Sequence, residues 1–250
     1  MKNKNDNYKT QLLLSVLLLI LSIWVLQCGF LKGNFSPDKT KISAAEINVK
    51  IDEYLTQAEN SNDDNQKAKL LGKAAVLLAE KGDIKKAMEV AEEGLRSNPT
   101  NADCLMALGE YRLQMGRFEE AAEVIDRSLN SNQKNAKTNY LRGNVSVALN
   151  DRFGAEDYYK QALEIEPDYA LAANNLATLQ MASGRPDLAL DTIEKSLKAG
   201  AKAAVLLKNA GIISEKLGQK STAKKYYSQY IEQNQFADDV TAVQSWMEAL

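Results

Sequence analysis

The sequence predicts an all-α fold, a solenoid built from helix–turn–helix repeats. Two observations support this prediction. One pattern recurs five times between residues 68 and 237 at a constant spacing of 34 residues, and each repeat holds two stretches of helical periodicity separated by a turn. Two helices of about thirteen residues cannot bury their own apolar face. Neighbouring repeats must therefore stack to build a shared core, and the array needs a cap at each end.

The register of the repeat is read from single columns. The predicted repeats are residues 68–101, 102–135, 136–169, 170–203 and 204–237. Alanine opens each repeat, and small side chains at the eighth and twentieth places allow its two helices to approach closely. The eighth place holds Ala75, Gly109, Gly143, Ala177 and Gly211, and the twentieth holds Ala87, Ala121, Ala155, Ala189 and Ala223.

The fifteenth place of each repeat marks the turn between its two helices. This place holds Gly82, Gly116, Asn150, Gly184 and Gly218. Helices commonly end on a residue with positive φ, which glycine adopts freely and asparagine tolerates. The turn residues therefore agree with the helical period.

A run of 34-residue repeats with these columns resembles the tetratricopeptide repeat family. The resemblance implies a right-handed superhelix whose first helices line a concave groove for a protein or an extended peptide. The third repeat departs from the family pattern, because Asn139 and Arg142 stand where the family prefers a large apolar residue. We therefore expect the first helix of that repeat to be packed loosely.

The N-terminal part of the chain predicts a membrane segment. Residues 1–11 form a polar tail, residues 12–31 are mostly apolar and uncharged, and residues 32–42 indicate a flexible tether. Twenty helical residues span about 30 Å, the hydrocarbon thickness of a bilayer. We interpret residues 12–31 as the transmembrane signal-anchor of a single-pass protein in a bacterial inner membrane, with periplasmic repeats. The alternative orientation, with the repeats facing the cytoplasm, is similar to that of mitochondrial import receptors that carry this repeat.

Cys28 supports a second interpretation of the same segment. Val25-Leu26-Gln27-Cys28 is similar to a bacterial lipoprotein signal, in which the cysteine is lipidated. Gln27 departs from that signal, which prefers glycine, alanine or serine before the cysteine. Lipidation of Cys28 is therefore the minority interpretation, beside an uncleaved anchor and a simply cleaved signal peptide.

A helix is expected on each side of the repeats. Residues 43–60 show helical periodicity, and Ser43 followed by Glu46 is the pattern of a capping box. A polar break separates this leading helix from the first repeat. Residues 238–250 are predicted to form a C-terminal capping helix, in which Trp246 packs against the last repeat.

The composition excludes several classes of function. The chain contains no histidine and two cysteines, which removes histidine-based acid–base catalysis and most zinc sites. A net charge of −2 gives no sign of nucleic-acid binding. The sequence holds no nucleophile–base pair, phosphate-binding glycine loop or metal-ligand spacing. We therefore expect no catalysis, no cofactor and no metal.

The resemblance also implies which residues line the groove, because the family uses fixed positions of each first helix. Amide side chains can donate to and accept from a peptide backbone of any sequence, as in the asparagine rows of some family members. The family's carboxylate clamp is not expected, since only Asn144 and Asn175 match it and its cations are missing. We refer to the following as the predicted groove residues: Tyr140, Asn144, Asn174, Asn175, Thr178, Lys208, Asn209 and Ile212.

The sequence therefore favours a non-catalytic, membrane-anchored adaptor that binds a protein or an extended peptide in its groove. Cell-envelope assembly, secretion and translocon-associated complexes are the processes that the resemblance implies. The alternative from another class is a structural subunit that self-associates or assembles a complex through its convex face. A chaperone-like holder of unfolded chains is a third interpretation, for which a broader apolar groove is expected.

Overall fold

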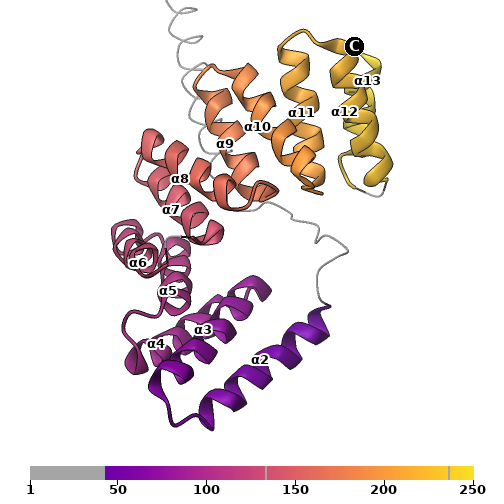
Figure 1. Cartoon of the computed structure of the whole chain (residues 1–250). Coiled ribbons are helices and arrows are strands. Elements are labelled where there is room, and N and C mark those ends of the chain that lie inside the picture. Colours follow the sequence, from indigo (N-terminus) through magenta and orange to yellow (C-terminus); the bar gives the residue numbers. More distant parts are fainter. Residues whose placement is uncertain (1–42, 133, 236) are drawn as a thin grey trace, which may run out of the picture. The chain divides into compact units, whose positions relative to one another are not determined.

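The computed structural model describes residues 43–132, 134–235 and 237–250. The contacts of the chain divide it into residues 1–41 and residues 42–250, and every described residue belongs to the second of these units. This unit is all-α, and in the described residues it contains twelve helices and no strand. Figure 1 shows these helices following one another in sequence order. They are α2 (Ala44–Glu59), α3 (Asp64–Lys81), α4 (Ile84–Ser97), α5 (Ala102–Gln114), α6 (Phe118–Ser131), α7 (Ala136–Ala148), α8 (Arg152–Ile165), α9 (Ala170–Ala182), α10 (Pro186–Ala199), α11 (Ala204–Lys216), α12 (Lys220–Gln233) and α13 (Val240–Glu248).

Each helix packs against the next one in the chain, so the core is a succession of local clusters. The small residues at the eighth place allow this close packing. A Cβ added to Gly143 would lie 2.5 Å from Cε1 of the buried Tyr159, and a Cβ on Gly211 would lie 2.5 Å from Cδ1 of Tyr227. A larger side chain at either glycine would therefore force the two helices apart.

The turns between paired helices have the predicted backbone conformation. Asn150 has a φ of 61°, and the glycines at the equivalent places also have positive φ. Gly82, for example, has a φ of 93° and donates its backbone N–H to the last turn of α3. The prediction of helix ends at these places is confirmed.

The capping box predicted at the start of α2 is also confirmed. The Ser43 hydroxyl accepts from the Glu46 backbone N–H at 3.2 Å, and the Glu46 carboxylate accepts from the Ser43 backbone N–H at 2.7 Å. These two bonds hold the first turn, and α2 then buries Ile51 and Ala58 among residues of α3 and α4.

α3 begins earlier than the sequence predicts. Asp63 caps it by accepting from the Gln66 backbone N–H at 3.0 Å, and the helix then runs from Asp64. The predicted polar break before Ala68 is therefore shorter than expected. Part of it forms the first turn of α3, because a capped first turn of a helix can be wholly polar.

α13 closes the described part of the chain. Val240 and Val243 are buried against Tyr227 and Tyr230 of α12. The Trp246 ring lies 6.1 Å from the Tyr227 ring, between centroids. The prediction that Trp246 packs against the preceding helices is confirmed.

The prediction of loose packing in α7 is wrong. Asn139 is only 1% exposed, and its amide nitrogen donates to the Asn135 carbonyl at 2.9 Å. The Arg142 guanidinium donates to Asp126 at 2.6 Å and lies over the Tyr158 ring. Polar side chains can fill columns that usually hold apolar ones when their hydrogen bonds are satisfied.

The predicted localisation is wrong for the part of the chain that the structure describes. α3 is the longest helix there, with 18 residues, and it carries six charged side chains. Among the described residues, no helix combines the length and the apolar composition that a membrane crossing requires. The signal-anchor predicted at residues 12–31 and the lipidation predicted at Cys28 lie outside the described residues. The assignment to a single-pass membrane protein with periplasmic repeats is therefore withdrawn.

Candidate functional site: an asparagine-lined groove

The predicted groove residues lie on three helices, α7, α9 and α11, which are the first helices of successive pairs. Most of them are half-buried, whereas Asn175 is 7% exposed and Ile212 is 38% exposed. Side chains in this state are held in place by the fold and still reach solvent. The face that they form is therefore ordered before any ligand arrives.

The four asparagines form one continuous chain of hydrogen bonds. The amide nitrogen of Asn209 donates to Asn174 Oδ1 at 2.7 Å, and that of Asn174 donates to Asn175 Oδ1 at 3.3 Å. The amide nitrogen of Asn175 then donates to Asn144 Oδ1 at 3.0 Å. We call these four residues the asparagine relay. It links α11, α9 and α7 in a single direction.

This direction determines which chemistry the relay can offer. Each relay bond uses one amide oxygen as an acceptor and one N–H of the two on the donating nitrogen. Asn174 and Asn209 therefore each keep a second N–H, whereas Asn144 and Asn175 also hydrogen-bond to the Tyr140 hydroxyl. The spare donors of Asn174 and Asn209 suit peptide carbonyl oxygens. The sequence predicted donors and acceptors alike.

Tyr159 fixes the end of the relay, and the sequence did not identify it. Its hydroxyl donates to Asn144 Oδ1 at 2.8 Å. Burial raises the pKa of the Tyr159 hydroxyl above its usual value, so it remains a donor at any physiological pH. Tyr159 belongs to α8, and its ring packs on Gly143, so the pairing of α7 with α8 orients Asn144.

Aromatic rings stand beside the relay. The Tyr140 ring lies 6.1 Å from the Tyr159 ring and meets the Tyr169 ring edge to face at 5.5 Å, between centroids. Burial raises the pKa of Tyr140, and hydrogen bonding to Asn144 and Asn175 opposes this rise. Tyr140 is a predicted groove residue that the structure does bring to the relay. Tyr169 was missed because it precedes its helix.

A cluster of ion pairs lies on the α3, α5 and α7 side of the relay. The Lys137 ammonium lies 3.2 Å from the Glu110 carboxylate and 3.9 Å from the Glu80 carboxylate. One lysine thus links three first helices. On α5, burial raises the pKa of Asp103, and the charges of Lys73 and Lys69 oppose this rise. This part of the face is charged, whereas the relay is neutral.

Not every predicted groove residue is available to a ligand. The Lys208 ammonium lies 2.6 Å from the Asp239 carboxylate and over the Tyr230 ring, and Tyr230 also donates to Asp239. Burial raises the pKa of Asp239, but the bonds from Lys208 and Tyr230 outweigh it and hold that pKa below its usual value. The Thr178 hydroxyl donates to the Asn174 carbonyl of its own helix at 2.8 Å. Lys208 and Thr178 therefore help to hold the face in shape.

The free cysteine of the described residues is not activated as a nucleophile. Cys104 is buried, and burial raises the pKa of its thiol to about 12, so it is a poor nucleophile. In the described ranges, no three histidine, cysteine or carboxylate side chains are placed to hold a metal ion together. The chemistry that the face can perform is hydrogen bonding and apolar contact.

The chain is similar in sequence to photosystem I assembly proteins named Ycf3. The protein from Prochlorococcus marinus strain MIT 9301 is 34% identical over 90 residues, which is 35% of this chain and 52% of the relative. The protein from strain MIT 9312 is 33% identical over 107 residues, which is 41% of this chain and 62% of the relative. The chain thus spans about half to three fifths of the length of these relatives.

Solved structures show the same fold at lower identity. The type IV pilus biogenesis factor PilW is 19% identical, with a TM-score of 0.59, and the match covers 81% of this chain and all of that one. PilF from Pseudomonas aeruginosa is 18% identical, with a TM-score of 0.59, covering 80% of this chain and 96% of that one.

A family model described as tetratricopeptide repeat matches residues 78–144 and 148–210. The two matched segments together span just over half of the chain and include most of α7 and all of α9. The helical pairs, their turns and the glycine contacts described above are those expected of such repeats. The chain belongs to the tetratricopeptide repeat family.

Proposed function

We propose that this chain is a non-catalytic scaffold that binds an extended peptide segment of a protein partner along the face that carries the asparagine relay. The observation that supports this proposal is the direction of the relay. Its spare N–H groups, on Asn174 and Asn209, lie on the successive first helices α9 and α11, and an extended peptide offers carbonyl oxygens at a regular interval of its own. Hydrogen bonds to the peptide backbone would determine how the peptide lies on this face without selecting its sequence.

The repeat boundaries belong to the same proposal. We assign the pairs α3–α4, α5–α6, α7–α8, α9–α10 and α11–α12 to repeats 68–101, 102–135, 136–169, 170–203 and 204–237. In this assignment α2 and α13, within residues 43–60 and 238–250, cap the two ends. Relay residues then come from the third, fourth and fifth repeats.

The names of the relatives support a role in building a larger protein complex. Ycf3 is named for the assembly of photosystem I, and PilW for the biogenesis of type IV pili. We propose that the peptide bound here belongs to a subunit of a multiprotein assembly. A general holder of unfolded chains is less well supported, because the relay is polar and lies beside charged residues.

Selection from a displayed library of random peptides tests the proposal. The wild-type chain is expected to retain a set of peptides that the double variant Asn175→Ala, Asn209→Ala does not retain. The matched control is Asn48→Ala, which removes an exposed amide from α2. Equal retention by the double variant, with its helical content unchanged, would show that the relay does not bind peptide.

A structural subunit that self-associates is the second candidate. A cleft on the α8–α10 side, described below, is the specific observation that favours it. The two functions use different faces and are not exclusive.

A further inference from the structure

A hollow lies between α8 and α10, and none of the predicted groove residues lines it. It is a cleft of about 540 Å³, and α9 contributes Leu176 and Gln180 to it. Leu163 of α8 and Leu188 of α10 give it an apolar lining. Its charged lining residues balance, with Glu156, Glu164 and Asp191 against Lys160, Arg185 and Lys195.

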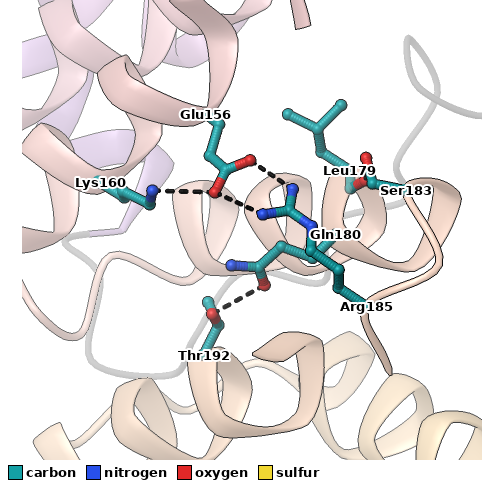
Figure 2. A network of polar contacts seen from close by, with 7 residues as sticks. All are labelled: Glu156, Lys160, Leu179, Gln180, Ser183, Arg185 and Thr192. Carbon is teal, nitrogen blue, oxygen red and sulfur yellow. Dashed lines mark hydrogen bonds and ion pairs between the residues drawn. The ribbon is translucent and has the colours of Figure 1, made fainter. Parts of the chain in front are cut away.

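Side chains that line this cleft form a network of polar contacts (Figure 2). Glu156 of α8 is paired through both carboxylate oxygens with Arg185, at 3.1 Å and 2.5 Å, and its Oε1 lies 2.9 Å from the Lys160 ammonium. The Thr192 hydroxyl donates to Gln180 Oε1 at 2.9 Å, which ties α10 to α9. Glu156 and Gln180 are both buried. The cleft is therefore preformed.

The equivalent ion pair cannot form at the other junctions between repeats. The places equivalent to Glu156 hold Met88, Ala122, Leu190 and Lys224. Among the five repeats, a carboxylate at this place, paired with a guanidinium of the next repeat, is thus specific to the junction of α8 with the turn before α10.

A protruding aromatic side chain lies on the helix that borders this cleft. Phe153 is 87% exposed, whereas Ala155 and Glu156, which follow it on α8, are buried. It precedes Glu156 by three residues, so both side chains lie on one stripe of the helix. An exposed phenylalanine ring leaves a large apolar area in contact with water. Covering this area with a partner protein favours association.

One stripe of α8 is complementary to itself when two copies of the helix run antiparallel. Arg152 and Glu164 lie at equal distances from the middle of the stripe, as do Phe153 and Leu163. Glu156 and Lys160 are related in the same way. In an antiparallel pair about a two-fold axis, Arg152 therefore faces Glu164 by charge, and Phe153 faces Leu163 by apolar character, while Glu156 stays buried and paired within its own chain.

We propose that two copies of this chain associate through the α8–α10 face, with antiparallel α8 helices and Phe153 of each copy in the leucine-lined cleft of the other. Phe153 would meet Leu163, Leu176 and Leu188 there. A foreign peptide is a less specific occupant, because the symmetry of the stripe has no role in binding one. The inference does not rest on peptide binding by the relay.

Sedimentation equilibrium of the full-length chain over a concentration series tests the proposal. We expect a monomer–dimer equilibrium in which the mass rises from 27.6 kDa toward twice that value. Phe153→Ala is expected to weaken dimerisation at least about tenfold. The matched control is Met115→Ala, which removes another exposed apolar side chain away from the stripe and should leave the dimer unchanged. A chain that stays monomeric, or a dimer that is indifferent to Phe153, overturns the proposal.

Charge reversal tests the antiparallel register itself. Arg152→Glu and Glu164→Arg should each weaken the dimer, because each creates two like-charge contacts, and the double variant should restore it by exchanging the partners. Glutamate at residue 152, near the N-terminus of α8, and arginine at residue 164, near its C-terminus, both interact favourably with the helix dipole. The fold is therefore expected to be retained. A double variant that is weaker than both single variants contradicts this register. Peptide retention by the relay should be the same in all these variants, so this test and the groove test can fail separately.

Discussion

Replacement of Asn175 by alanine is the most informative single change to the relay, because Asn175 occupies its centre. The variant removes one bond to Asn144 at 3.0 Å and one from Asn174 at 3.3 Å. Two hydrogen bonds of this kind contribute about 1–3 kcal/mol together. Alanine has a higher helix propensity than asparagine, which offsets up to about 0.7 kcal/mol of the lost stability. Asn144 also keeps its bond from Tyr159, and Asn174 reaches solvent, so neither is left wholly unsatisfied.

We therefore expect Asn175→Ala to lower the free energy of unfolding by about 1–2 kcal/mol. Urea denaturation followed by circular dichroism measures this change. In Asn48→Ala, which changes the same residue types on an exposed helix face, the free energy should be unchanged or slightly higher. A loss of more than about 4 kcal/mol would show that Asn175 acts through core packing and not through the relay. No loss at all would show that its hydrogen bonds do not contribute to stability.

Three further predictions follow from other parts of the molecule. Gly211→Ala should lower the free energy of unfolding by about 1–3 kcal/mol in a denaturant titration, because its Cβ would collide with the buried Tyr227 ring; an unchanged midpoint would show that the two helices can separate freely. The bonds from Arg185 and Lys160 lower the pKa of Glu156 to about 2 from 4.5, so its contribution to stability is complete above pH 4.5 and is lost as the pH falls toward 2. Melting temperatures of the wild type and Glu156→Gln, measured across that range, should therefore converge in acid, and a constant difference would contradict the pairing. Cys104 should be inert to a thiol reagent at pH 8 until denaturant is added, since burial raises its pKa to about 12, whereas labelling of the folded chain at Cys104 would contradict its burial.

The repeat period and the turn chemistry were sufficient to predict the helices. Glycine at the eighth place and glycine or asparagine at the turn are local requirements, and the structure shows the reason for each at Gly143 and Asn150. The start of α3 was missed because a polar first turn has no apolar periodicity. The hydrogen bonding of Arg142 could not be predicted, because its partner, Asp126, belongs to the preceding helix.

The candidate site could be predicted only in part. Family columns identified the asparagines, but the direction of the relay depends on the orientation of amide groups that the sequence does not specify. Tyr159 was overlooked because it comes from a second helix and reaches Asn144 across the pair. The pairing of Lys208 with Asp239 could not be predicted, since Asp239 lies 31 residues away, just before α13. Long-range side-chain partners are the information that a repeat pattern omits.

The side-chain amide groups of the relay provide the most direct measurement of the central claim. A peptide selected by the wild-type chain is added to the 15N-labelled protein, and the NH2 signals of asparagine are followed by NMR. We predict that the signals of Asn144, Asn174, Asn175 and Asn209 shift together with the bound fraction, while that of Asn48 does not. Binding that leaves the four relay signals in place would contradict the account, because the peptide would then occupy another face.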